Sequence, residues 1–364
     1  MKLSILRKLC ATFVIVCTIA CQAQNRYSIT DLGTLSGGST VARKINAWGH
    51  VAGTSGERDG GAGHAALWRG SPKNLTSLSS FDDSDYSEAT TINNRGEMAG
   101  LCNTKNNMQA VLWSTSGAIK ELGTLTGDTS SRAFGINDRG KVVGLSSGPR
   151  GERAFVWTQD GMVAVAVPAG TKSSEAHGIN NRDQIVGEFR SSAETHAFLW
   201  APRSGFKDLG VIPGYQTSKA TAINDAGEVV GSSSGPFGTQ SFIWRLTEGI
   251  QTIADIPSEE FSEALDINNQ SEIVGTYEGS LGNRAYLWTK KDRFVDLNNL
   301  IPAGRGVVLT MAVSINDRGQ ILAIGMSAPD ISPDRPMHQD EEDDLHAVDV
   351  HSFLLTPTSD ALLR

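Results

Sequence analysis

Hydrophobic and polar residues alternate with a period of two in short stretches along most of the chain. Four such stretches follow one another at Arg132–Ile136, Lys141–Gly144, Arg153–Trp157 and Met162–Val167. A strand with one buried face requires this alternation, because successive side chains point to opposite sides of a sheet. No stretch shows a sustained helical period. The pattern therefore predicts an all-β chain built from four-stranded units.

The four-stranded unit occurs seven times, at intervals of 43 to 48 residues. Each copy has an Ile-Asn pair after its first strand and an alanine three residues before that pair. The pairs begin at Ile45, Ile92, Ile136, Ile179, Ile223, Ile267 and Ile315. The third strand of each copy ends in Trp68, Trp113, Trp157, Trp200, Trp244, Trp288 and, in the last copy, Leu355. A repeat whose units pack only on their neighbours allows 364 residues to fold as one domain.

These units predict a seven-bladed β-propeller of four-stranded blades. The repeated alanine fits a first strand near the axis, where neighbouring blades converge. Residues 27–33 match the fourth strand of later copies, whereas the last copy supplies only three strands. One N-terminal strand plus three C-terminal strands would complete the seventh blade and leave no exposed sheet edge. An open solenoid and two β-sandwiches are the alternatives, and the divided blade argues against both.

The first hairpin of each copy is tight, as in the segment Ile136-Asn-Asp-Arg-Gly-Lys141. We expect Asn137 and Asp138 to cap this turn through their own side chains, and Gly140 to take the left-handed position. Asp183 and Ser271 stand at the glycine position in two other copies. This turn chemistry accounts for the Asn-Asp pair without a metal.

Residues 1–23 have the features of a signal peptide: basic residues, then a short apolar run, then small residues. The run is too short to span a bilayer, so we expect no transmembrane helix in the mature chain. Cys21 follows a lipobox-like segment, which makes lipid anchoring at Cys21 the alternative to free secretion. We therefore expect a secreted, extracellular or periplasmic protein with a single domain over residues 24–364.

Loss of the leader removes three positive charges, so the formal net charge falls from −8 to −11. An acidic protein is a poor partner for nucleic acid or for an anionic membrane surface. Cys102 is then the one cysteine that remains, which excludes an intramolecular disulfide in the mature chain.

The repeat resembles the HAF repeat of bacterial extracellular proteins. The pattern shared is Ala-x-x-Ile-Asn, then Gly-x-Val-Val-Gly, then a triplet seen here as His196-Ala-Phe before Leu-Trp, then Asp-Leu-Gly. The resemblance covers about residues 27 to 356, and the four elements recur in register. It implies an exported location and a propeller-like architecture. It assigns no activity and no site residue to the chain.

The last copy carries an acidic insertion at about residues 327–346. Asp340, Glu341, Asp343 and Asp344 in this insertion are hard oxygen ligands of the kind that Ca²⁺ prefers. They lack the alternate spacing and the turn glycine of a calcium-binding loop. A solvated acidic loop is therefore the alternative interpretation. No other cofactor is predicted.

Charged residues of alternating sign stand near the start of five inner strands. They are Glu88, Arg132, Glu175, Lys219 and Glu263. The long polar connections that precede these strands would surround the channel mouth, where propellers commonly bind partners. Tyr86 and Tyr215 would add stacking surface for a sugar or a peptide. The alternative is that all of these residues merely solvate the strand ends.

No catalytic motif is present. The chain has no Gly-x-Ser-x-Gly elbow, and Cys102 has no base beside it in the sequence. The leading hypothesis is an exported, non-enzymatic and monomeric binding module for an extracellular glycan, peptide or surface protein. A polysaccharide hydrolase or lyase with carboxylates at the channel mouth is one alternative, and a structural spacer is the other. We expect the seventh copy, with its insertion and missing tryptophan, to be the specialised one.

Overall fold

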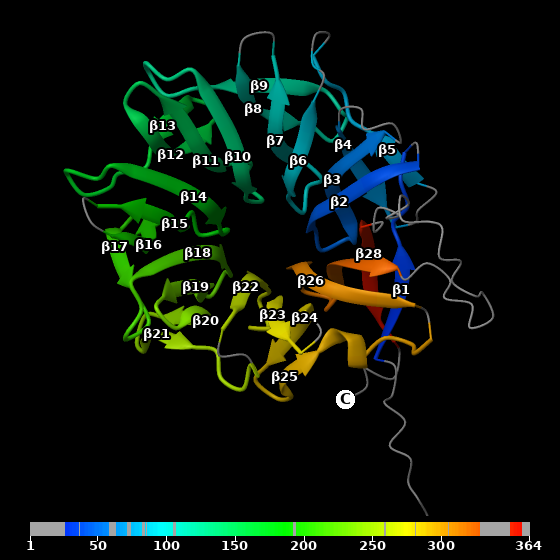
Figure 1. Cartoon of the computed structure of the whole chain (residues 1–364). Helices are drawn as coiled ribbons and strands as arrows, with labels where there is room; N and C mark the ends of the chain where they lie inside the picture. Colours follow the sequence, from blue (N-terminus) through cyan, green and yellow to red (C-terminus); the bar gives the residue numbers. More distant parts are fainter. Residues whose placement is uncertain are drawn as a thin grey trace, which may run out of the picture.

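The protein is a ring of seven four-stranded antiparallel sheets, which confirms the predicted all-β fold and the seven-bladed propeller (Figure 1). The computed structural model describes residues 26–35, 37–57, 63–70, 74–81, 84, 86–104, 107–191, 194–257, 260–280, 282–304, 306–327 and 350–358. The predicted signal peptide and nearly all of the acidic insertion lie outside these residues.

Each sheet forms one blade, and in blades 1 to 6 the strands follow the chain from the axis outward (Figure 1). Blade 1 contains β2 (Gly37–Ile45), β3 (His50–Glu57), β4 (His64–Arg69) and β5 (Leu75–Ser77); blade 2 contains β6 (Ser87–Ile92), β7 (Met98–Asn103), β8 (Met108–Trp113) and β9 (Ile119–Gly123); blade 3 contains β10 (Ser130–Ile136), β11 (Val142–Gly148), β12 (Gly151–Thr158) and β13 (Gly161–Ala164). Blade 4 contains β14 (Ser173–Ile179), β15 (Ile185–Arg190), β16 (Thr195–Ala201) and β17 (Gly205–Gly210); blade 5 contains β18 (Thr217–Ile223), β19 (Val229–Gly235), β20 (Gly238–Arg245) and β21 (Gly249–Thr252); blade 6 contains β22 (Ser262–Ile267), β23 (Ile273–Gly279), β24 (Gly282–Thr289) and β25 (Arg293–Asp296), followed by the short 3₁₀ helix η2 (Leu297–Asn299).

Blade 7 joins strands from the two ends of the described chain. It contains β26 (Val307–Ile315), β27 (Ile321–Ser327) and β28 (Val350–Pro357), with β1 (Tyr27–Asp31) as its outer strand. The register of β1 on β28 runs from Tyr27 opposite Pro357 to Asp31 opposite Phe353. Figure 1 shows the blue strand β1 beside the red strand β28 in this blade.

The repeated glycine of the second strand is required by a close backbone approach. In blade 2 the inner strand β6 has a bulge between Ala89 and Thr91. A Cβ atom on Gly100 of β7 would lie 1.9 Å from the carbonyl oxygen of Glu88. A contact this short is impossible, so only glycine fits. The repeated alanine beside the bulge is fully buried, as expected for a strand where blades converge.

The repeated tryptophan is buried in most blades, and in two of them its indole N–H bonds to the preceding blade, whereas the buried indole N–H of Trp288 has no hydrogen-bond partner. The indole of Trp68 in blade 1 donates to the carbonyl of Leu32, which follows β1 of blade 7, at 2.8 Å. The indole of Trp113 donates in the same way to the carbonyl of Ser79, which follows β5 of blade 1, at 2.7 Å. Leu355 takes this place in blade 7 and is also buried.

The Ile-Asn turns close a continuous ring of hydrogen bonds around the axis. Within its own turn, the Oδ1 atom of Asn137 accepts from the backbone N–H groups of Arg139 and Lys141. Its Nδ2 atom donates to the carbonyl of Asn180 in the next blade at 3.1 Å. The same interblade bond, at 2.9–3.1 Å, runs from Asn46 to Asn93, Asn93 to Asn137, Asn180 to Asn224, Asn224 to Asn268, Asn268 to Asn316 and Asn316 to Asn46.

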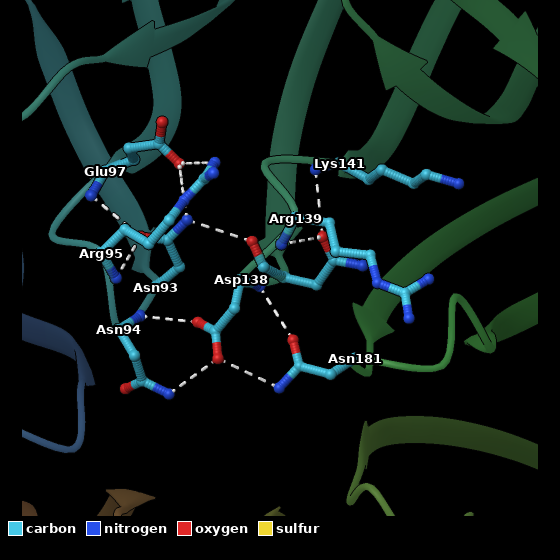
Figure 2. Close-up of polar contacts among 9 residues, drawn as sticks. Asn93, Asn94, Arg95, Glu97, Asp138, Arg139, Lys141 and Asn181 are labelled. Carbon is cyan, nitrogen blue, oxygen red and sulfur yellow. Dashed lines mark hydrogen bonds and ion pairs between the residues drawn. The ribbon is translucent and has the colours of Figure 1, made fainter.

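The residue after each asparagine forms a second, outer ring. The expectation that Asp138 caps its own turn was wrong, because its Oδ1 atom accepts from the backbone N–H of Asn94 in the preceding blade at 2.8 Å (Figure 2). Its Oδ2 atom accepts from the side chains of Asn94 and Asn181. Asparagine and aspartate alternate around this ring, which comprises Asn94, Asp138, Asn181, Asp225, Asn269, Asp317 and Ala47. Seven positions cannot alternate perfectly, and the ring is interrupted at Ala47, which has no side-chain acceptor.

Replacing Ala47 should therefore complete the outer ring. We expect Ala47→Asn to raise the free energy of unfolding by about 0.5–1.5 kcal/mol, because its side chain supplies the missing acceptor and a donor to the Asp317 carboxylate. Ala47→Asp would supply the acceptor but place a second carboxylate beside Asp317, so we expect a smaller gain or a loss. Chemical denaturation of the two variants measures the difference. Equal stabilisation by both would contradict the alternating pattern as the source of the gain.

Candidate functional site

The five charged residues predicted from sequence lie at one level of the ring. Each comes directly before the buried alanine of an inner strand. The Ile-Asn turns lie on one side of the ring, which we call the turn face. The five charged residues lie toward the opposite side, which we call the loop face. The five residues pair with the second strands of blades 2 to 6 at Leu101, Leu145, Glu188, Ser232 and Thr276. They share a level, but their environments differ.

Glu88 is used inside the fold. It is 8% exposed, and its two carboxylate oxygens accept from Arg43 Nε at 2.6 Å and from the Tyr86 hydroxyl at 3.0 Å. Burial, and then the Glu88 charge, raise the pKa of Tyr86 to about 12. The three groups join blade 1 to blade 2, so the Glu88 carboxylate and the Tyr86 hydroxyl already have partners within the fold.

Tyr215 is also less available than predicted. Its ring packs on the buried cluster of blades 4 and 5 that contains Leu209 and Ile212. The exposed aromatic on this face is instead Phe237, which is 70% exposed on the turn between β19 and β20. Phe261, a half-buried residue just before β22, is the second aromatic there. Phe237 carries no sequence signal of a binding role, because it is a single aromatic residue in a short turn.

Blade 4 brings three ionisable side chains together. Glu175 on β14 lies directly opposite Glu188 on β15, so both side chains are on one face of the sheet. His177 occupies the bulge of β14, and its Nε2 atom lies 3.3 Å from Oε1 of Glu175. One ligand atom from each of Glu175, His177 and Glu188 falls within 4.8 Å of the other two. Glu175 was predicted, whereas His177 and Glu188 were not.

The two carboxylates of this cluster have opposite pKa shifts. Burial raises the pKa of Glu188, and only the charges of His177 and Lys219 counteract it. Burial also acts to raise the pKa of Glu175, but the hydrogen bond and charge of His177, with the charges of Lys219 and Arg132, outweigh it and lower that pKa. The ionised form is thus disfavoured at Glu188 and favoured at Glu175.

Two cavities open beside the cluster on the loop face. One, of about 420 Å³, lies over blades 4 to 6 and is lined by Lys219, Phe261, Glu263 and several serine and threonine hydroxyls. The other, of about 210 Å³, lies against blades 3 and 4. Both are lined by Glu188 and Thr195, so they adjoin, and we call the two together the loop-face groove.

A third cavity, of about 300 Å³, occupies the axis toward the turn face. It is lined by the Ile-Asn turns of all seven blades and by His177. Lys44 and Asp266 cross it with an ion pair of 2.7 Å, and Ser314 donates to the same carboxylate. The carboxylates of the outer ring already accept hydrogen bonds from neighbouring blades. The polar lining of this cavity is therefore explained by the contacts that hold the blades together.

The predicted calcium ligands and the predicted lipid-anchor cysteine lie in parts of the chain that the structure does not describe. The former are Asp340, Glu341, Asp343 and Asp344, and the latter is Cys21. Cys102 is buried and unpaired. None of the helices in the described part of the chain has the length and apolar character needed to span a bilayer.

Comparison with solved structures supports the propeller fold. Similar structures include a streptogramin B lyase, with a TM-score of 0.56 and 12% identity over 91% of this chain and 98% of that one. The virginiamycin B lyase from Staphylococcus aureus has a TM-score of 0.51 and 13% identity over 93% and 97% of the two chains. The β-propeller domain of the Trilobed protease from Pyrococcus furiosus has a TM-score of 0.52 and 12% identity over 80% and 92%. No protein-family model and no curated protein sequence matches the chain.

Neutral substitutions at the two carboxylates should shift stability in opposite directions. We expect Glu188→Gln to raise the melting temperature at pH 7.5 in a chelator, because it removes a charge that burial disfavours. Since the folded pKa of Glu188 is raised, this gain should disappear as the pH falls below the unfolded value of about 4.3.

Glu175→Gln should lower the melting temperature at pH 7.5, and its loss should persist until the pH falls through the lowered folded pKa of Glu175. Thermal melts of both variants at pH 7.5 and pH 4 make the comparison. A loss of stability in Glu188→Gln at pH 7.5 would contradict the proposed electrostatics of the cluster.

Proposed function

We propose that this protein is an exported, non-enzymatic binding module that recognises a glycan of the cell envelope or extracellular space through the loop-face groove. The observation that carries the proposal is the groove itself, which collects hydroxyl, ammonium and carboxylate groups and the Phe261 ring from adjacent blades. The same proposal includes membership of the HAF-repeat family and a monomeric state. It also includes export, with either a cleaved leader or a lipid anchor at Cys21.

The chemistry of the groove suits a carbohydrate better than an apolar ligand. Sugar hydroxyls both donate and accept hydrogen bonds, and the groove offers donors at Lys219 and at threonine hydroxyls and acceptors at Glu263 and Glu188. The Phe237 ring lies 70% exposed next to Gly238, at the start of the strand that carries Thr239 of the groove. An exposed aromatic ring beside polar groups supplies an apolar surface for the face of a pyranose ring. A peptide or a surface protein is the other class of ligand that fits a polar groove.

A polysaccharide hydrolase or lyase is a second candidate, and one observation favours it. Carboxylate oxygens of Glu175 and Glu188 lie within 4.8 Å of each other at the edge of the groove. Retaining glycosidases place their two carboxyl groups about 5 Å apart, on either side of the bond that they cleave. Glu175 and Glu188 instead project from one face of a single sheet. This arrangement favours the binding function.

The binding site can be tested with exposed residues, whose replacement leaves the core intact. We expect Phe237→Ala and Lys219→Ala each to weaken binding of a ligand found on a glycan array by roughly 10-fold or more, as expected when a contact worth about 1.4 kcal/mol is lost. Titration calorimetry with the isolated glycan measures the change. The matched control is Trp48→Ala, because Trp48 is 60% exposed on the turn face and should leave the affinity unchanged.

Two results would overturn the proposal. Loss of binding in Trp48→Ala but not in Phe237→Ala would move recognition to the turn face. Release of new reducing ends or unsaturated sugars from a bound polysaccharide, abolished in Glu175→Gln, would select the enzymatic candidate instead.

A further inference from the structure

We propose that Glu175, His177 and Glu188 of blade 4 form a binding site for a divalent transition-metal ion of the zinc type. One imidazole nitrogen and two carboxylates are a ligand set that zinc accepts, with a fourth position left for water or a ligand. This site goes beyond the proposed glycan binding and does not depend on it, because the metal ion is itself the ligand.

The hydrogen bond on the far side of His177 fixes its tautomer. The Nδ1 atom lies 2.8 Å from the carbonyl oxygen of Ala220 in blade 5. A carbonyl can only accept, so Nδ1 carries a proton, and Nε2 is the nitrogen left for Glu175 or for a metal ion. Histidines that bind metal ions are usually oriented in this way, by a second hydrogen bond to a backbone carbonyl or a carboxylate.

The Nε2 atom points toward carboxylates. The Nε2 atom and Oε1 of Glu175 are 3.3 Å apart. At this distance either a proton on Nε2, which makes the hydrogen bond to Glu175 described above, or a metal cation lies between the two atoms. A metal ion that binds here therefore replaces that proton. A tetrahedral zinc ion with bonds of about 2.0–2.1 Å places neighbouring ligand atoms roughly 3.3–3.4 Å apart. His177 and Glu175 are therefore already spaced as two ligands of one ion.

Glu188 is the third ligand, and it occupies a position where the other six blades carry an uncharged residue. The corresponding residues are Thr54, Leu101, Leu145, Ser232, Thr276 and Ile324. No hydrogen bond reaches the Glu188 carboxylate from the residues that the structure describes. A half-buried carboxylate without a hydrogen-bond donor is costly, and a bound cation would compensate this cost.

Among the described residues, blade 4 alone combines these three groups. The residues at the His177 position in blades 1, 2, 3, 5 and 6 are Arg43, Thr90, Phe134, Thr221 and Leu265. Lys219 and Arg132 act on Glu175, and Glu152 adds a further negative charge near Glu188. The cluster borders the loop-face groove and the axial cavity, so a hydrated ion can reach it from solvent.

His196 provides a matched control, because it also lies between two carboxylates. Its Nε2 atom contacts Glu194 at 3.3 Å, and its Nδ1 atom contacts Asp208 at 3.0 Å. The two carboxylates are on different nitrogens of the ring, so they cannot converge with the imidazole on one ion. Because its two carboxylates do not meet at one nitrogen of the ring, His196 should bind no zinc.

The test is titration of the full chain, produced without a histidine tag and stripped with a chelator, with Zn²⁺ alone. We expect one saturable site in the wild type that raises the melting temperature, and an affinity at least roughly 100-fold lower in His177→Gln and in Glu188→Gln. His196→Gln should bind as the wild type does. Co²⁺ should give a visible absorption band that is lost in His177→Gln and kept in His196→Gln.

The acidic insertion remains in every variant, so any zinc that it binds forms a constant background. If His177→Gln fails to fold, Glu188→Gln carries the test, since it is expected to be the more stable chain without metal. Zinc binding that is equal in the wild type, His177→Gln and Glu188→Gln would overturn the site, and so would the absence of saturable binding. Loss of glycan binding alone would leave this result unaffected, so the two proposals fail separately.

Discussion

Seven asparagine side chains, each bonded to the backbone carbonyl of the next asparagine, join every blade to its neighbour around the axis. Each side chain has two roles, because Oδ1 holds its own turn while Nδ2 holds the next blade. A four-stranded blade cannot bury both of its faces alone, so the propeller exists only as long as its blades stay in contact. One such bond contributes only about 0.5–1.5 kcal/mol, but removing it would leave a buried carbonyl unpaired.

The asparagine ring leaves the neighbouring positions of the inner strand free to vary. Two residues before each isoleucine, the side chain can reach the alanine carbonyl of the next blade: Thr90 bonds to Ala133, and Thr221 bonds to Ala264. His177 makes the same contact with Ala220 through Nδ1. A histidine at this position therefore keeps the interblade bond of a threonine and still presents its second nitrogen to Glu175. Blade 4 gains three ionisable groups without losing a contact between blades.

The fold could be predicted from the sequence because its signals are local and repeated. Period-two alternation, a tight turn and a fixed spacing each recur in every copy, and Gly140 adopts the left-handed conformation (φ +75°) that the turn predicted. The partners of Asp138 could not be predicted in this way, because a side chain that caps its own turn and one that reaches the next blade have the same sequence. Glu188 was missed for a different reason. It looks ordinary within its own strand and becomes unusual only when aligned with Leu101 and Leu145 at the same register.

The two faces of the propeller differ in how far their polar groups are already used. On the turn face, the carboxylates of Asp138, Asp225 and Asp317 accept hydrogen bonds from neighbouring asparagines, and Lys44 is paired with Asp266. A ligand there would have to displace bonds that hold blades together, so its gain would be offset by a loss of stability. On the loop face, Glu188 accepts no hydrogen bond from the described residues, and Lys219 is exposed in the groove. Recognition requires donors and acceptors that the fold does not already use, and this requirement, more than the size of a cavity, is the reason for placing the proposed binding site on the loop face.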